Sequence, residues 1–111
     1  MRLRLNDRER QLVLSKDLCR LSTINPNGWP HVVPVGFIYV QGKLYIPSDR
    51  RAEKIRNLAR NNKATLLVDD ELVEHGLMLE CRSKIIQGRR AEPMLSHMRE
   101  MKGWQKMQLQ Q

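Results

Sequence analysis

Residues 21–58, LSTINPNGWPHVVPVGFIYVQGKLYIPSDRRAEKIRNL, contain the pattern from which the fold is expected. Runs rich in Val, Ile, Phe and Tyr alternate here with two turn sequences, Asn25-Pro26-Asn27-Gly28 and Gln41-Gly42. Proline fixes one φ angle and Asn-Gly tolerates positive φ, so the first of these sequences favours a tight reversal of the chain. The stretch therefore predicts three strands joined by two turns and followed by a basic helix.

The basic helix is expected over about 51–60, and its start has the character of an anion site. Ser48 and Asp49 are the predicted N-caps. Arg51 and Lys54 add positive charge at the point where unpaired backbone N–H groups and the helix dipole favour an anion. The alternative is a capped, solvated basic helix without a ligand. Two adjacent arginines before the first turn oppose the dipole, and this favours the anion.

The strand predicted over 30–40 contains two prolines, Pro30 and Pro34. Proline cannot donate to a β-ladder, so these positions belong to a sheet edge, a bulge or a place where a ligand replaces the neighbouring strand. A flat aromatic ligand could lie against His31–Phe37 and accept hydrogen bonds from backbone N–H groups near Pro34. The alternatives are an edge strand without a ligand and, for His31, an ordinary surface histidine.

The other segments complete a mostly β protein. Asn6 and Glu9 predict a capping box for a helix over about 7–16. Methionines at helical spacing predict an amphipathic helix over about 91–102 that ends at Gly103 and packs on the core or a dimer interface. Further strands are expected over 18–24, 64–68 and 77–86, with an acidic loop at Asp69-Asp70-Glu71. Five or six strands in consecutive hairpins favour a small antiparallel barrel.

Composition limits the possible functions. The 111 residues are enough for one domain without a second independent core. Residues 1–63 hold thirteen Lys/Arg against five Asp/Glu, which accounts for the whole net charge of +8 and indicates an anionic partner such as a phosphate cofactor, nucleic acid or acidic lipid. Cys19 and Cys81 match no metal-binding spacing, and no run could cross a bilayer. We therefore expect a soluble, cytoplasmic protein.

The ordered succession RLST-x-x-P-N-G-x-P-H-V-V-P-V-x-F, G-K-L-Y-I-P-S, R-x-x-K-x-R-N-L and L-L-V-D-D resembles the pyridoxamine 5′-phosphate oxidase-like flavoproteins. The likeness is strongest to the small FMN- or deazaflavin-binding members and covers about residues 18–88. It implies a six-stranded antiparallel split barrel that forms a homodimer with two flavin sites at the subunit interface.

The resemblance also implies a set of cofactor-binding residues. The strand segment His31–Gly36 would line the ring system and ribityl chain, Pro47 and Ser48 would contact the ring edge and phosphate, and Lys54 would bind the phosphate with help from Arg51. Within the strand segment the expected contacts are His31, Val33, Pro34, Val35 and Gly36. Larger oxidases carry an arginine where His31 stands, a lysine near Gly36 and a glutamine near Gly76, so vitamin B6 oxidation is not expected.

The resemblance leads to an FMN-binding homodimer that transfers hydride through the flavin to an unknown substrate. No side chain is expected to act as a catalytic acid or base. One alternative is a reductase of the same fold that uses the deazaflavin F420. Another is a basic nucleic-acid-binding module, which the scarcity of aromatic residues among the basic ones disfavours. A third is a dimeric scaffold that has lost its cofactor.

Overall fold

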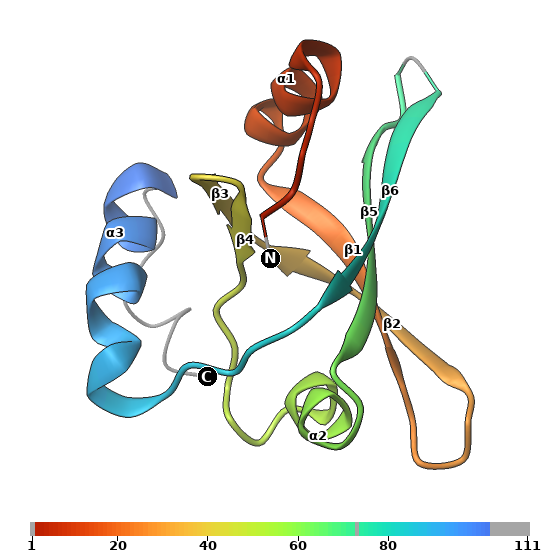
Figure 1. Ribbon diagram of the computed structural model, residues 1–111, viewed down its shortest axis with the longest axis vertical. Helices are drawn as coiled ribbons and strands as arrows, with labels where there is room; N and C mark the ends of the chain where they lie inside the picture. The colour runs from red at the N-terminus through yellow and green to blue at the C-terminus, as the bar shows by residue number, and fades with distance from the viewer. Residues whose placement is uncertain (1, 73, 103–111) are drawn as a thin grey trace.

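The computed structural model describes residues 2–72 and 74–102 of the chain (Figure 1). The elements in these ranges are, in order, α1 (Asp7–Ser15), β1 (Leu18–Ile24), β2 (Pro30–Gly36), β3 (Ile38–Val40), β4 (Lys43–Tyr45), α2 (Glu53–Arg60), β5 (Lys63–Asp70), β6 (His75–Arg82), the 3-10 turn η1 (Gly88–Arg90) and α3 (Glu92–Lys102). Helices flank the strands on several sides (Figure 1). The expected mostly β class is therefore corrected to a small mixed α/β domain.

The strands pair antiparallel throughout the described ranges, as the consecutive hairpins predicted. Four of them form one sheet in the order β2-β1-β5-β6, while β3 and β4 pair separately. In the first hairpin, Leu18 lies opposite Gly36 and Ile24 opposite Pro30. Strand β2 is an edge of the larger sheet, which is one of the positions that Pro30 and Pro34 predicted for it.

A single residue, Phe37, separates β2 from β3 where the sequence predicted one strand over 30–40. Phe37 is completely buried, and its backbone N–H donates to the carbonyl of Asp17 at 3.2 Å. The chain leaves the four-stranded sheet at this residue and enters the hairpin with β4. The apolar run continues through the corner without interruption, so hydrophobic periodicity gives no sign of the break.

The core lies between α1 and the inner face of the four-stranded sheet. The capping box predicted for α1 is confirmed, with Asn6 and Glu9 each accepting from the other's backbone N–H at 2.8 Å. Burial alternates along the strands because successive side chains point to opposite faces. The core cluster consists of Leu12, Val13, Cys19, Leu21, Val35, Phe37, Ala64, Leu66, Val68 and Leu79.

Two further boundaries bear on the sequence predictions. Strand β5 runs to Asp70, so the expected acidic loop is wrong at its first two positions. Asp69 and Asp70 instead form ion pairs with Arg20 at 3.6 Å and Lys16 at 3.3 Å. Helix α3 confirms the helix predicted over 91–102. Gly103, expected to end that helix, lies outside the described residues.

Candidate functional site

The start of α2 has no side-chain cap, contrary to the sequence prediction. The helix begins at Glu53, two residues later than expected, and its N-cap is Ala52 in an extended conformation. Ser48 and Asp49 are therefore not the N-caps. Asp49 forms a turn instead, in which its Oδ1 accepts from the N–H of Arg51 at 2.9 Å and its carbonyl accepts from Ala52 at 3.0 Å. The first N–H groups of α2 are thus left without a side-chain acceptor.

The predicted cations at this corner differ in their surroundings. Arg51 is 86% exposed, and its Nε lies 3.8 Å from Oδ1 of Asp49, a pairing that contributes little at such exposure. Lys54 is half-buried in the first turn of α2 and forms no ion pair with a carboxylate of the described ranges. Ser48 is also half-buried, and its hydroxyl donates to the carbonyl of Asp49 at 3.0 Å. Pro47 lies just before it, between β4 and α2.

The predicted site residues of β2 divide between the two faces of the strand. His31, Val33 and Val35 occupy its more buried face, and Val35 belongs to the core cluster. Pro34 lies on the outer face, opposite Arg20 of β1. Because the side chain of Val35 packs in the core, only the backbone of Val35 could contact a ligand. Because β2 is an edge strand, its backbone groups that face away from β1 have no partner strand.

A short side-chain contact joins β2 to α2. Nε2 of His31 lies 2.9 Å from Oε2 of Glu53, while Nδ1 of the same ring is buried without a hydrogen-bond partner. The contact brings the predicted ring-binding strand next to the predicted phosphate-binding helix. Because His31 already has a carboxylate neighbour, it does not offer a free positive charge to a phosphate, as an arginine at this position could.

A polar network that the sequence analysis missed fixes α2 against the first hairpin. Asn57 is 1% exposed and donates from Nδ2 to Oγ1 of Thr23 at 3.0 Å and to Oδ1 of Asn25 at 2.9 Å. Arg60 donates to Oδ1 of Asn57 at 2.9 Å and to the carbonyl of Ile24 at 2.8 Å. No sequence signal marked Asn57, because its partners lie on a distant strand and turn.

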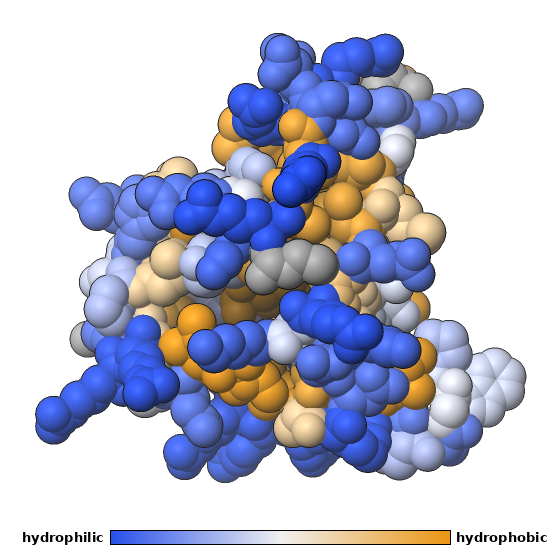
Figure 2. Space-filling model, in the orientation of Figure 1, coloured by the Kyte–Doolittle hydropathy of each residue, from blue (hydrophilic) through white to orange (hydrophobic). Residues whose placement is uncertain are grey.

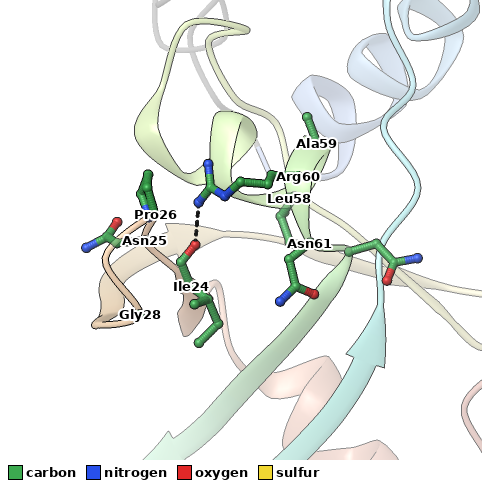
Figure 3. Close-up of a pocket in the computed structure, with 9 residues that line it drawn as sticks. Ile24, Asn25, Pro26, Gly28, Leu58, Ala59, Arg60 and Asn61 are labelled. Atoms are coloured by element: carbon green, nitrogen blue, oxygen red, sulfur yellow. Dashed lines mark hydrogen bonds between the residues drawn. The ribbon is translucent and has the colours of Figure 1, made fainter.

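Two open clefts lie next to each other, away from the predicted residues. The larger has a volume of about 640 Å³ and lies between the turn at Asn25–Gly28 and the end of α2 (Figure 3). The smaller, of about 470 Å³, lies over β5 and β6. None of the nine predicted site residues lines either cleft. The corner at the start of α2 is thus a surface rather than one of these hollows.

A sequence profile of the family described as pyridoxamine 5′-phosphate oxidase matches residues 5–110. The chain belongs to the pyridoxamine 5′-phosphate oxidase family. The match spans all the described strands and every predicted site residue, and it confirms the resemblance seen in the sequence. Among curated proteins, none matches the chain significantly.

Solved structures share the fold of this family member at low sequence identity. HutZ, the heme storage protein from Vibrio cholerae, is 18% identical with a TM-score of 0.75, over 91% of this chain and 78% of that one. An F420 reductase is also 18% identical with a TM-score of 0.75, over 86% and 77%. A FAD-binding protein from Mesorhizobium loti is 19% identical with a TM-score of 0.69, over 92% and 79%. At these identities the comparison establishes the split-barrel fold and leaves the ligand open.

The described residues give little support for a metal site, a reactive thiol or a membrane-spanning helix. These residues contain no cluster of three or more His, Cys, Asp or Glu side chains that could hold a metal ion. Burial raises the pKa of the Cys19 thiol to about 12 and also raises the pKa of Cys81, so neither is an activated nucleophile. No helix among them is long and apolar enough to cross a membrane.

Proposed function

We propose that this member of the pyridoxamine 5′-phosphate oxidase family binds FMN and acts as a flavin-dependent oxidoreductase. The observation that carries the proposal is the uncapped start of α2, where Lys54 has no carboxylate partner among the described residues. A phosphate at this corner would accept hydrogen bonds from backbone N–H groups and pair with Lys54. Arg51, exposed and weakly paired, could turn towards the same phosphate.

The edge of β2 would hold the ring system. Alternate backbone groups of the segment His31–Gly36 face this edge, where the sheet has no neighbouring strand. Because His31 is paired with Glu53, we expect it to position the ring and not to act as a second cation for the phosphate. FMN, when bound, would supply hydride transfer, while the chain supplies orientation and the positive charge that favours a reduced, anionic flavin.

A second copy of the chain would complete the site. Leu18, Val32 and Met78 lie on the outer face of the four-stranded sheet and are 61%, 60% and 64% exposed. Hydrophobic side chains also reach the surface between charged ones on the face shown in Figure 2. Burial of such surface in a homodimer is favourable. Sedimentation velocity should give a dimer, and Val32→Asp should shift it towards monomer; a monomeric wild type contradicts this part of the proposal.

The phosphate corner is tested by titration of the protein with FMN. Lys54→Ala should weaken binding by about 1.5–3 kcal/mol, the scale of a charge-assisted hydrogen bond, which is a loss of roughly ten- to a hundredfold in affinity. Lys43→Ala is the matched control, because Lys43 is an exposed lysine on β4 away from α2. Equal affinities for the two variants would remove Lys54 from the site.

The identity of the cofactor is tested on the native protein. Mass spectrometry of the small molecule released on denaturation should detect FMN. The deazaflavin F420 is the second candidate, because the same cationic corner would suit its phosphate and a reductase that uses it shares the fold. Release of haem, or steeply salt-dependent binding to oligonucleotides with no response to FMN, would refute the flavin proposal.

A further inference from the structure

Strands β1 and β5 separate at one end of the four-stranded sheet. Their ladder runs from Arg20 opposite Leu67 to Ser22 opposite Thr65 and stops there, although β1 continues to Ile24. The carbonyl of Ile24 accepts from a side chain, Arg60, at 2.8 Å. The smaller cleft, about 470 Å³, lies at this separation.

The two clefts are neighbours and are together called the groove here. Both are lined by Ile24 and Asn61, so the smaller cleft lies next to the larger one beside the first turn and the end of α2. In Figure 3, Arg60 reaches across towards Ile24, and Asn61 lies on the strand side of the helix end. The groove is thus bordered by a hairpin turn, a helix end and two strands.

The strand end of the groove holds two cations that form no ion pair within the described ranges. Lys63 and Arg82 lie directly opposite each other in the β5–β6 ladder and both line the smaller cleft. Like charges in this arrangement repel each other. Neither forms an ion pair within residues 2–72 and 74–102, whereas Arg20 on the same face pairs with Asp69 at 3.6 Å and Glu71 at 2.9 Å.

Hydrogen-bonding groups accompany the cations. The hydroxyls of Ser22 and Thr65 lie on opposite strands of the next ladder position, and neither makes a side-chain hydrogen bond within the described ranges. Glu80, opposite Thr65, would repel an anion and could accept from a ligand hydroxyl. The carbonyl end of α2 likewise disfavours negative charge near Asn61. An anionic group therefore fits only the Lys63–Arg82 end.

We propose that this groove is a second binding site, for a small phosphomonoester whose phosphate lies between Lys63 and Arg82. A guanidinium and an ammonium suit a phosphate dianion, and the two hydroxyls can donate to its remaining oxygens. The organic part would extend towards Asn61 and Ile24. The site is distinct from the corner proposed for FMN, because α2 has eight residues and spans about 12 Å between the two. Ser22 lies opposite Val32 on the outer face of the sheet, so in the proposed homodimer the site would border the subunit interface, with the Lys63–Arg82 end farthest from Val32.

The test is a titration of the ¹⁵N-labelled chain with inorganic phosphate at constant ionic strength, followed by NMR. Saturable shifts should appear at residues 61–65 and 80–83. The double variant Lys63→Gln/Arg82→Gln should lose at least tenfold in phosphate affinity, and Lys43→Gln should stay within twofold of wild type. Non-saturating shifts, or equal affinity in the double variant, would overturn the proposal.

A repeat with Lys54→Ala separates the two sites. Shifts at 61–65 and 80–83 should persist with unchanged affinity, whatever the outcome for FMN. Shifts that centre on residues 48–54 in the wild type, with none at the groove, would place the phosphate at the other corner and refute a second site. Thermal unfolding adds an independent measurement, because phosphate should raise the Tm of the wild type more than that of Lys63→Gln.

Discussion

The buried amide of Asn57 gives the sharpest test of how α2 is held. Asn57→Ala removes the hydrogen bonds to Thr23 at 3.0 Å and to Asn25 at 2.9 Å. Thr23 is 1% exposed, so its hydroxyl would lose its partner in the interior. An unsatisfied buried group costs about 1–3 kcal/mol, and the half-buried bond to Asn25 adds about 1 kcal/mol. The free energy of unfolding should therefore fall by about 2–4 kcal/mol.

Urea unfolding followed by circular dichroism measures this change at a fixed protein concentration, which matters if the chain dimerises. Asn62→Ala is the matched control, because Asn62 is exposed and its side chain makes no hydrogen bond to the residues that the structure describes, so the change should stay within about 0.5 kcal/mol. The double variant Thr23→Val/Asn57→Leu should recover part of the loss, since both polar partners are then absent. A value for Asn57→Ala equal to that of the control would show that the network does not stabilise the fold.

Two further outcomes are expected. Gly28→Ala and Gly42→Ala both place a side chain at positive φ (+86° and +82°), but only at Gly42 does the new Cβ meet another atom, Cβ of Arg2 at 3.2 Å. Gly28→Ala should lower the free energy of unfolding, measured by chemical denaturation, by about 1 kcal/mol, and Gly42→Ala should lower it clearly more. A larger loss for Gly28→Ala would contradict the close contact at Gly42. Burial raises the pKa of the Cys19 thiol from 9.0 to about 12, so the unfolded chain releases a proton that the folded protein keeps. The free energy of unfolding should fall between about pH 9 and 12 more steeply in wild type than in Cys19→Ala, and parallel curves would contradict the shift.

Structural features that depend only on residues close together in the sequence were predictable. The capping box of Asn6 and Glu9 and the turn at Asn25–Gly28 are both present, and Gly28 adopts φ +86° while its N–H donates to Asn25 at 2.9 Å. The strand order within each hairpin followed from such turns. The ordered motifs also indicated the family correctly.

Features that depend on distant partners were not predictable in this way. Asp49 had the right residue type for an N-cap, but a side chain of this type can also bond two residues ahead, and here it does so with Arg51. The burial of Asn57 requires Thr23, and the position of His31 requires Glu53. The roles of the nine candidate cofactor residues remain predictions, because they depend on a ligand and a second chain.

The corner at Phe37 restricts how the chain could change in length during evolution. Insertion of one residue there would turn every following side chain of β3 to the opposite surface, because strands alternate with a period of two. The turns at Asn25–Gly28 and after Asp70 have no such constraint, since added residues would extend into solvent. Homologous chains should therefore gain and lose residues at those two turns while the spacing between Pro34 and Ile38 stays fixed.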